Sequence, residues 1–76
     1  AVDRAIASYQ SALEYADSDS EKQDILINIA MCYEQKERYK NALDALKRIQ
    51  LTSPFLDEKK SQLERLVKFQ GRRLNR

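Results

Sequence analysis

The stretch that decides the fold is residues 24–54, DILINIAMCYEQKERYKNALDALKRIQLTSP. Apolar residues recur in it at steps of three and four as far as Gln35, and a second such run ends before Pro54. This period is typical of amphipathic helices, and the polar residues between the two runs indicate a turn. The first run is apolar nearly all round, so its helix should have neighbours on several sides. The stretch therefore predicts two helices joined by a turn, packed within a larger helical assembly.

The same period extends over most of the chain and predicts an all-α fold of about four helices. The expected helices cover residues 2–16, 21–35, 39–51 and 54–70. In the first helix, the side chains expected to face inward are Ala5, Ile6, Tyr9, Ala12, Leu13 and Ala16. In the third helix they are Ala42, Leu43, Ala45, Leu46 and Ile49. In the fourth helix they are Leu56, Leu63, Leu66, Val67 and Phe69.

Polar residues between the runs predict where the helices begin and end. Ser20 and Gln23 have the spacing of a capping box at the start of the second helix. A hydroxyl of Thr52 or Ser53 can cap the fourth helix in the same way. Gly71 is expected to end that helix and to leave residues 71–76 as a frayed basic tail.

The composition describes one small helical domain without the residues that most catalytic sites need. The 76 residues are 42% hydrophobic and 34% charged, with no His, one Gly and one Cys. Without His there is no His-dependent triad or His metal site, and one Gly cannot build a phosphate-binding loop. Cys32 lies in an apolar run and is interpreted as a small core residue. We therefore expect no enzyme activity, no cofactor and no metal site.

The order of large and small residues in the central unit resembles that of the tetratricopeptide repeat, a 34-residue helix–turn–helix. With the unit laid over residues 23–56, the positions that match are Leu26, Ile29, Ala30, Tyr33, Tyr39, Ala42, Leu46 and Pro54. Two positions depart from the family, because Ile49 replaces the usual Ala and Glu37 stands where Gly is frequent. The resemblance implies antiparallel helical hairpins of an α-solenoid in a single domain, residues 1–76. Residues 2–16 would then be the second helix of a partial repeat, and residues 54–70 a capping helix.

The resemblance also implies a ligand groove lined by the first helix of each unit. On this sequence the groove residues are Asp24, Ile27, Asn28, Met31, Glu34 and Gln35. Ile27 and Met31 favour an apolar peptide or helix as the bound partner. In the alternative, the fourth helix or an upstream helix covers Ile27 and Met31, and both residues belong to the core.

Asn28 matches the clamp with which some members of the family bind the acidic C-terminus of chaperones. However, Glu58 and Gln62 stand where that clamp needs Lys and Arg, so this activity is not expected.

A strong charge gradient lies behind the net charge of +2. Residues 1–24 carry six acids and two bases, a net of −4, whereas residues 59–76 carry seven bases and one acid, a net of +6. The basic segment is either a solvated helix face or a contact for an acidic protein. Nucleic acid or anionic lipid is the least favoured reading, because aromatic residues do not alternate with the bases.

The expected function is a cytoplasmic scaffold or adaptor that assembles complexes by binding a protein or peptide partner. A second copy, or a chain that supplies the missing half-repeat, is a further expected partner. A chaperone for a secreted or exported client and a basic nucleic-acid accessory module are the alternatives. No membrane span is expected, because the longest charge-free apolar run, Ile25–Tyr33, is too short to cross a bilayer.

Overall fold

The structure is a single layer of four helices. It is a computed structural model that describes the backbone of residues 1–74 and the side chains of residues 1–72. The helices are α1 (Val2–Tyr15), α2 (Asp19–Gln35), α3 (Tyr39–Lys47) and α4 (Pro54–Leu74), and this part of the chain contains no strand. The all-α prediction is therefore confirmed.

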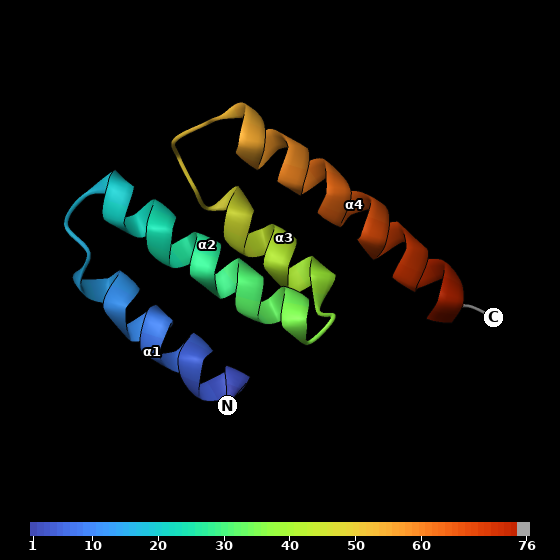
Figure 1. Ribbon diagram of the computed structural model, residues 1–76, viewed down its shortest axis with the longest axis horizontal. Coiled ribbons are helices and arrows are strands. Elements are labelled where there is room, and N and C mark those ends of the chain that lie inside the picture. Colours follow the sequence, from blue (N-terminus) through green and yellow to red (C-terminus); the bar gives the residue numbers. More distant parts are fainter. Residues whose placement is uncertain (75–76) are drawn as a thin grey trace.

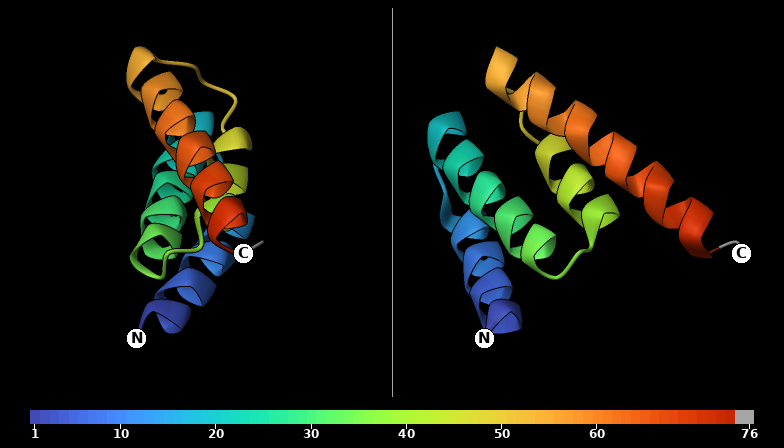
Figure 2. Two further views of the ribbon diagram at one scale, coloured as in Figure 1. Left: turned by 90° about the vertical axis from the view of Figure 1, so that its right-hand side faces the viewer. Right: turned by 45° about the vertical axis from the view of Figure 1, so that its right-hand side comes forward.

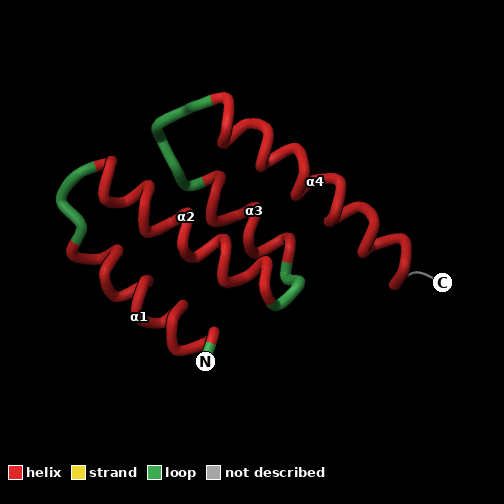
Figure 3. The backbone as a smooth tube through the Cα atoms, viewed as in Figure 1, coloured by secondary structure: helices red, strands yellow, loops and turns green. Residues whose placement is uncertain are grey.

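The helices follow one another side by side and alternate in direction (Figures 1 and 2). Within residues 1–74, each helix packs only against its neighbours in the chain, so α2 and α3 have two partners, whereas α1 and α4 have one each. The Cα atoms extend over 44 × 30 × 13 Å, so the shortest extent is less than half of either of the other two. The loops 16–18 and 48–53 lie at one end of the layer and the turn 36–38 lies at the other (Figure 3).

Serine side chains cap two of the helices. Ser18 is the N-cap of α2, and its Oγ accepts a hydrogen bond from the backbone N–H of Glu21 at 3.1 Å. The predicted start at Ser20 was wrong by two residues, because Ser18 has the same three-residue spacing to a Glu and takes the capping position. At α4, the Oγ of Ser53 accepts from the backbone N–H of Leu56 at 3.2 Å, as expected. Pro54 follows this cap as the first helical residue.

Two predicted helix ends differ from the structure. Helix α3 ends at Lys47, because the backbone N–H groups of Arg48 and Ile49 turn to carbonyls three residues back and tighten the last turn. Helix α4 does not end at Gly71 but continues to Leu74, and residues 75–76 of the expected tail lie outside the described residues. Gly71 does not adopt the positive φ of a helix-terminating glycine. A glycine within a helix costs only about 0.5–1 kcal/mol relative to alanine, which is too little to stop a long helix.

The core lies between α2, α3 and α4, and all five side chains predicted to face inward from the third helix are buried. The inward side chains of the outer helices α1 and α4 were predicted less well, because each of these helices packs against a single neighbour and only one narrow stripe of its side chains is buried. In α1, Ile6 is buried but Ala12 is exposed, and in α4, Leu66 and Phe69 are exposed despite the prediction. The buried cluster comprises Leu26, Ile29, Ala30, Ala42, Leu43, Ala45, Leu46, Ile49, Leu56 and Leu63.

An ion pair joins the first turn of α1 to the turn between α2 and α3. The Nζ of Lys36 lies 2.8 Å from the Oδ1 of Asp3. The hydrogen bond from this ammonium group, and then its charge, lower the pKa of Asp3 below its usual value. Because the Asp3 side chain is exposed, the pair should contribute little to the stability of the fold.

The turn between α2 and α3 forces Glu37 into a left-handed backbone conformation. Its φ is +58°. The backbone N–H of Arg38 donates to the carbonyl of Tyr33 and that of Glu37 to the carbonyl of Glu34, both at 2.9 Å. This pair of bonds is the Schellman motif, whose left-handed position is usually glycine. The carbonyl of Glu37 also accepts from the Nε2 of Gln70 at 2.6 Å, so the turn contacts α4.

Replacing Glu37 with glycine should therefore stabilise the chain by about 0.5–1 kcal/mol. The left-handed conformation costs a residue with a Cβ about 1–2 kcal/mol, and the greater freedom of glycine in the unfolded chain offsets part of that gain. Urea denaturation measures the change. The control Lys22→Gly introduces glycine at an exposed position inside α2 and should destabilise the chain by about 1 kcal/mol. A loss of stability in both variants would contradict the strain at Glu37.

Candidate binding groove between α2 and α4

An apolar groove of about 190 Å³ lies between α2 and α4. These two helices flank α3 and run in the same direction (Figure 1). The buried side chains Ala30, Leu46 and Leu56 form its base, one from each of α2, α3 and α4. The remaining lining side chains are Ile27, Met31 and Glu34 from α2 and Phe55 and Lys59 from α4.

Three of the six predicted groove residues line this groove. Ile27 is half-buried and packs against the buried cluster, so part of its side chain belongs to the core. Met31 is 53% exposed, which means that no described helix covers it. Ile27 thus belongs in part to the core, whereas Met31 is open to solvent, and a binding role for either residue stays a prediction.

The other three predicted residues, Asp24, Asn28 and Gln35, lie on α2 but do not line the groove. Asp24 and Gln35 are exposed and Asn28 is half-buried. Residues one apart on a helix point about 100° away from each other, which places Asn28 beside the groove residue Ile27 on the next face. A binding role for these three residues stays a prediction.

An ion pair joins Glu34 of α2 and Lys59 of α4, both of which line the groove. The Nζ of Lys59 donates to the Oε2 of Glu34 at 3.0 Å, and both side chains are partly buried. The second carboxylate oxygen, Oε1 of Glu34, is buried and has no hydrogen-bond partner. An unpaired buried acceptor typically costs about 1–3 kcal/mol, so this oxygen favours any ligand that brings a donor to it.

Phe55 and Lys59 form the α4 wall of the groove and were not anticipated. Phe55 is 67% exposed although it is a large apolar residue in the first turn of α4. The sequence signal was present, because Phe55 directly precedes the inward Leu56 and so had to point to another side of the helix. The periodicity of α4 alone could not show that this side faces α2.

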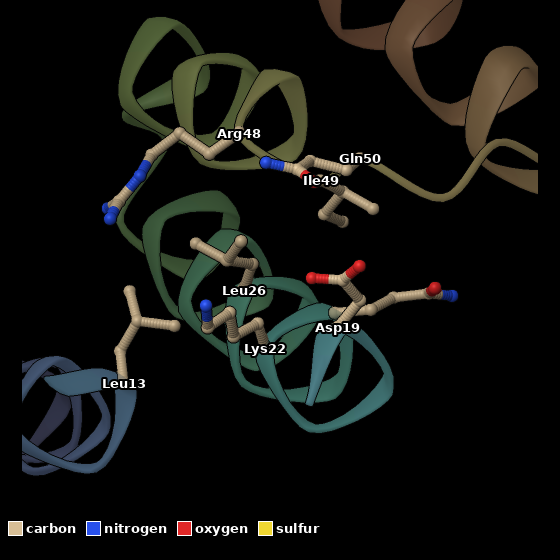
Figure 4. A pocket seen from close by; sticks show the side chains of 8 residues that line it. Leu13, Asp19, Lys22, Leu26, Arg48, Ile49 and Gln50 are labelled. Carbon is tan, nitrogen blue, oxygen red and sulfur yellow. The ribbon is translucent and has the colours of Figure 1, made fainter. Parts of the chain in front are cut away.

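A second cavity, of about 250 Å³, lies at the end of the layer that holds the loops. Figure 4 shows the end of α3 and the residues after it, Arg48, Ile49 and Gln50, facing α2, with Leu13 of α1 at the side. The α2 residues that line it include Asp19 and Lys22, so charges of both signs surround the space. This mixture does not select one class of ligand.

Other chemistry in the described part of the chain is sparse. Cys32, which was interpreted as a small core residue, is a free thiol that is only half-buried. Among residues 1–72, no three side chains of His, Cys, Asp or Glu are grouped so as to hold a metal ion. Within residues 1–74, no helix has the length and hydropathy needed to cross a membrane.

Comparison of the chain with protein-family models, curated proteins and solved structures found no match. The function is therefore inferred from the chemistry of the groove and from the pattern of the sequence.

Proposed function

We propose that this chain is a tetratricopeptide-type interaction module, a scaffold or adaptor that holds a peptide or helix of a partner protein in the groove between α2 and α4. One observation carries the proposal: Met31 of α2 and Phe55 of α4 are large apolar side chains that line the same groove and are more than half exposed. Exposed apolar surface of this kind usually marks an interaction site. Three residues that the sequence pattern assigned to a ligand face, Ile27, Met31 and Glu34, line this groove, which supports the proposal.

The arrangement of the helices supports the α-solenoid part of the proposal. In a solenoid, each helical unit contacts only its neighbours, and in this chain each helix packs only against helices adjacent in sequence within residues 1–74. Residues 23–56 then form the full repeat, and α4 forms the second wall of its groove.

Binding would be driven by burial of apolar surface. A large side chain of the partner that enters the groove removes Met31 and Phe55 from water, at about 25 cal/mol per Å² of apolar area. The flexible thioether of Met31 can adapt to different side chains and contacts aromatic rings favourably. The Lys59–Glu34 pair then provides a polar end to the site and fixes the orientation of the ligand.

Met31→Asp tests this function. Peptides selected from a random display library on the immobilised chain should carry a large apolar residue and should shift the amide signals of residues around Ile27, Met31 and Phe55 in NMR spectra. The variant should bind them at least about tenfold more weakly, because a carboxylate in the groove must be desolvated. Met31 is preferred to Ile27 for this test, because Ile27 also packs against the core.

The matched control is Asn41→Asp, which adds the same charge at an exposed position on α3. It should leave peptide binding unchanged, and both variants should keep the helical circular dichroism of the parent chain. Equal binding by the parent chain and Met31→Asp would show that the groove is not the site.

A further inference from the structure

Beyond the groove, α4 carries the exposed apolar residue Leu66 and a set of exposed cations, and the polar residues Lys59 and Gln62 lie between the groove and Leu66. Leu66 is 37% exposed and follows Phe55 by eleven residues, which is about three helical turns, so both lie on the same side of α4. Arg65, Lys68 and Arg72 are exposed in the same part of α4, on a side of the helix that is turned by more than a quarter of a revolution from Leu66. Within the described residues none of the three forms an ion pair. A ligand that fills the groove and also reaches around α4 would meet these cations, which favours a ligand with acidic residues next to its apolar side chain.

The chain itself carries a segment of this chemistry where α1 meets α2. We call residues 14–21, EYADSDSE, the acidic corner, because they contain four acids and no base. The acids, Glu14, Asp17, Asp19 and Glu21, are exposed and form no ion pair within the described part of the chain. Tyr15, the last residue of α1, is 80% exposed and is the most exposed of the large apolar or aromatic side chains described.

Tyr15 also matches the groove in its chemistry. Its ring is an apolar body of the kind that Met31 and Phe55 can contact, through sulfur–aromatic and aromatic–aromatic packing. Its hydroxyl group is a donor, and the Oε1 of Glu34 in the groove wall is a buried acceptor that lacks one. The cavity of about 190 Å³ suits a single large side chain.

We propose that the groove and the basic side of α4 receive the acidic corner of a second copy of this chain, with Tyr15 in the groove. This self-association rests on the groove of the proposed function but needs no foreign partner. The chain cannot fill its own groove in this way, because α1 and α4 lie at opposite edges of the layer (Figure 1). The two surfaces differ, so the contact is head-to-tail and each pair keeps one free groove and one free corner.

Sedimentation velocity from micromolar to millimolar concentration should show a weight-average mass that rises beyond that of a dimer. Tyr15→Ala removes the inserted side chain and Met31→Asp damages the groove, and each should weaken association at least about tenfold. Ser8→Ala on α1 and Asn41→Asp on α3 are exposed controls that should associate like the parent chain. Phe55→Ser replaces Met31→Asp if circular dichroism shows that the latter is unfolded.

Mixing the two impaired variants gives the decisive result. Met31→Asp keeps an intact corner and Tyr15→Ala keeps an intact groove, so an equimolar mixture should form dimers that contain one of each and grow no further. A monomer at all concentrations, association that Tyr15→Ala does not weaken, or a mixture that stays monomeric would each overturn the proposal. Binding of display-selected peptides to the groove would survive any of these results, so failure of self-association and failure of the proposed function are distinguishable.

Discussion

Replacing Leu63 with alanine should lower the free energy of unfolding by about 2–5 kcal/mol. Leu63 has no exposed surface and lies on the side of α4 that faces the buried cluster. Removal of its side chain leaves a cavity beside α3, the one described helix against which α4 packs. Small domains of this size have little stability in reserve, so the loss should be a large fraction of the total. Urea denaturation followed by circular dichroism measures it.

The matched control for this loss is Leu66→Ala, the same substitution three residues later in the same helix. Leu66 is 37% exposed, so less apolar surface returns to water and no closed cavity forms. The variant should retain most of the stability of the parent chain. Equal losses for the two variants would mean that α4 is rotated relative to the structure.

The second large effect is expected from Ala42→Leu, which should destabilise the chain by about 1–3 kcal/mol through overpacking. Ala42 has no exposed surface and belongs to the same buried cluster as Ala30. Interiors are packed to the density of organic crystals, so three additional carbon atoms must displace neighbouring side chains or separate the helices.

Thermal melting of Ala42→Leu checks this prediction against Ala7→Leu, which adds the same atoms at an exposed position of α1. The exposed variant should melt within a few degrees of the parent chain. A melting temperature of Ala42→Leu that equals that of the control would show that α3 does not approach its neighbours closely at this position.

The sequence predicted the centre of the layer better than its edges, for a physical reason. Helix α3 has neighbours on two sides, so nearly all its apolar residues are inside and the periodic pattern identifies them. Helix α4 has apolar residues on more than one side, and packing alone decides that Leu56 and Leu63 are covered while Leu66 remains exposed. Periodicity shows which residues share a face but not which face meets a neighbour.

The same limit applies to the groove. Met31 could be placed on the ligand face from its spacing within one helix. Phe55 and Lys59 could not, because their position across from α2 depends on the path of residues 48–53, which have no periodic structure. The start of α2 was ambiguous for a simpler reason, since Ser18 and Ser20 both have a suitable partner three residues later and only one can be the cap.

Because the described helices pack only against helices adjacent in sequence, the chain can fold through local steps. The connections that must close are short, spanning residues 16–18, 36–38 and 48–53, so little loop entropy opposes each step. A contact order this low is typical of domains that fold within microseconds to milliseconds. Unfolding can also proceed through local steps. Helix α1 contributes one buried side chain, Ile6, and within the described residues packs only against α2, so we expect it to be among the first helices to detach while α2 and α3 stay paired.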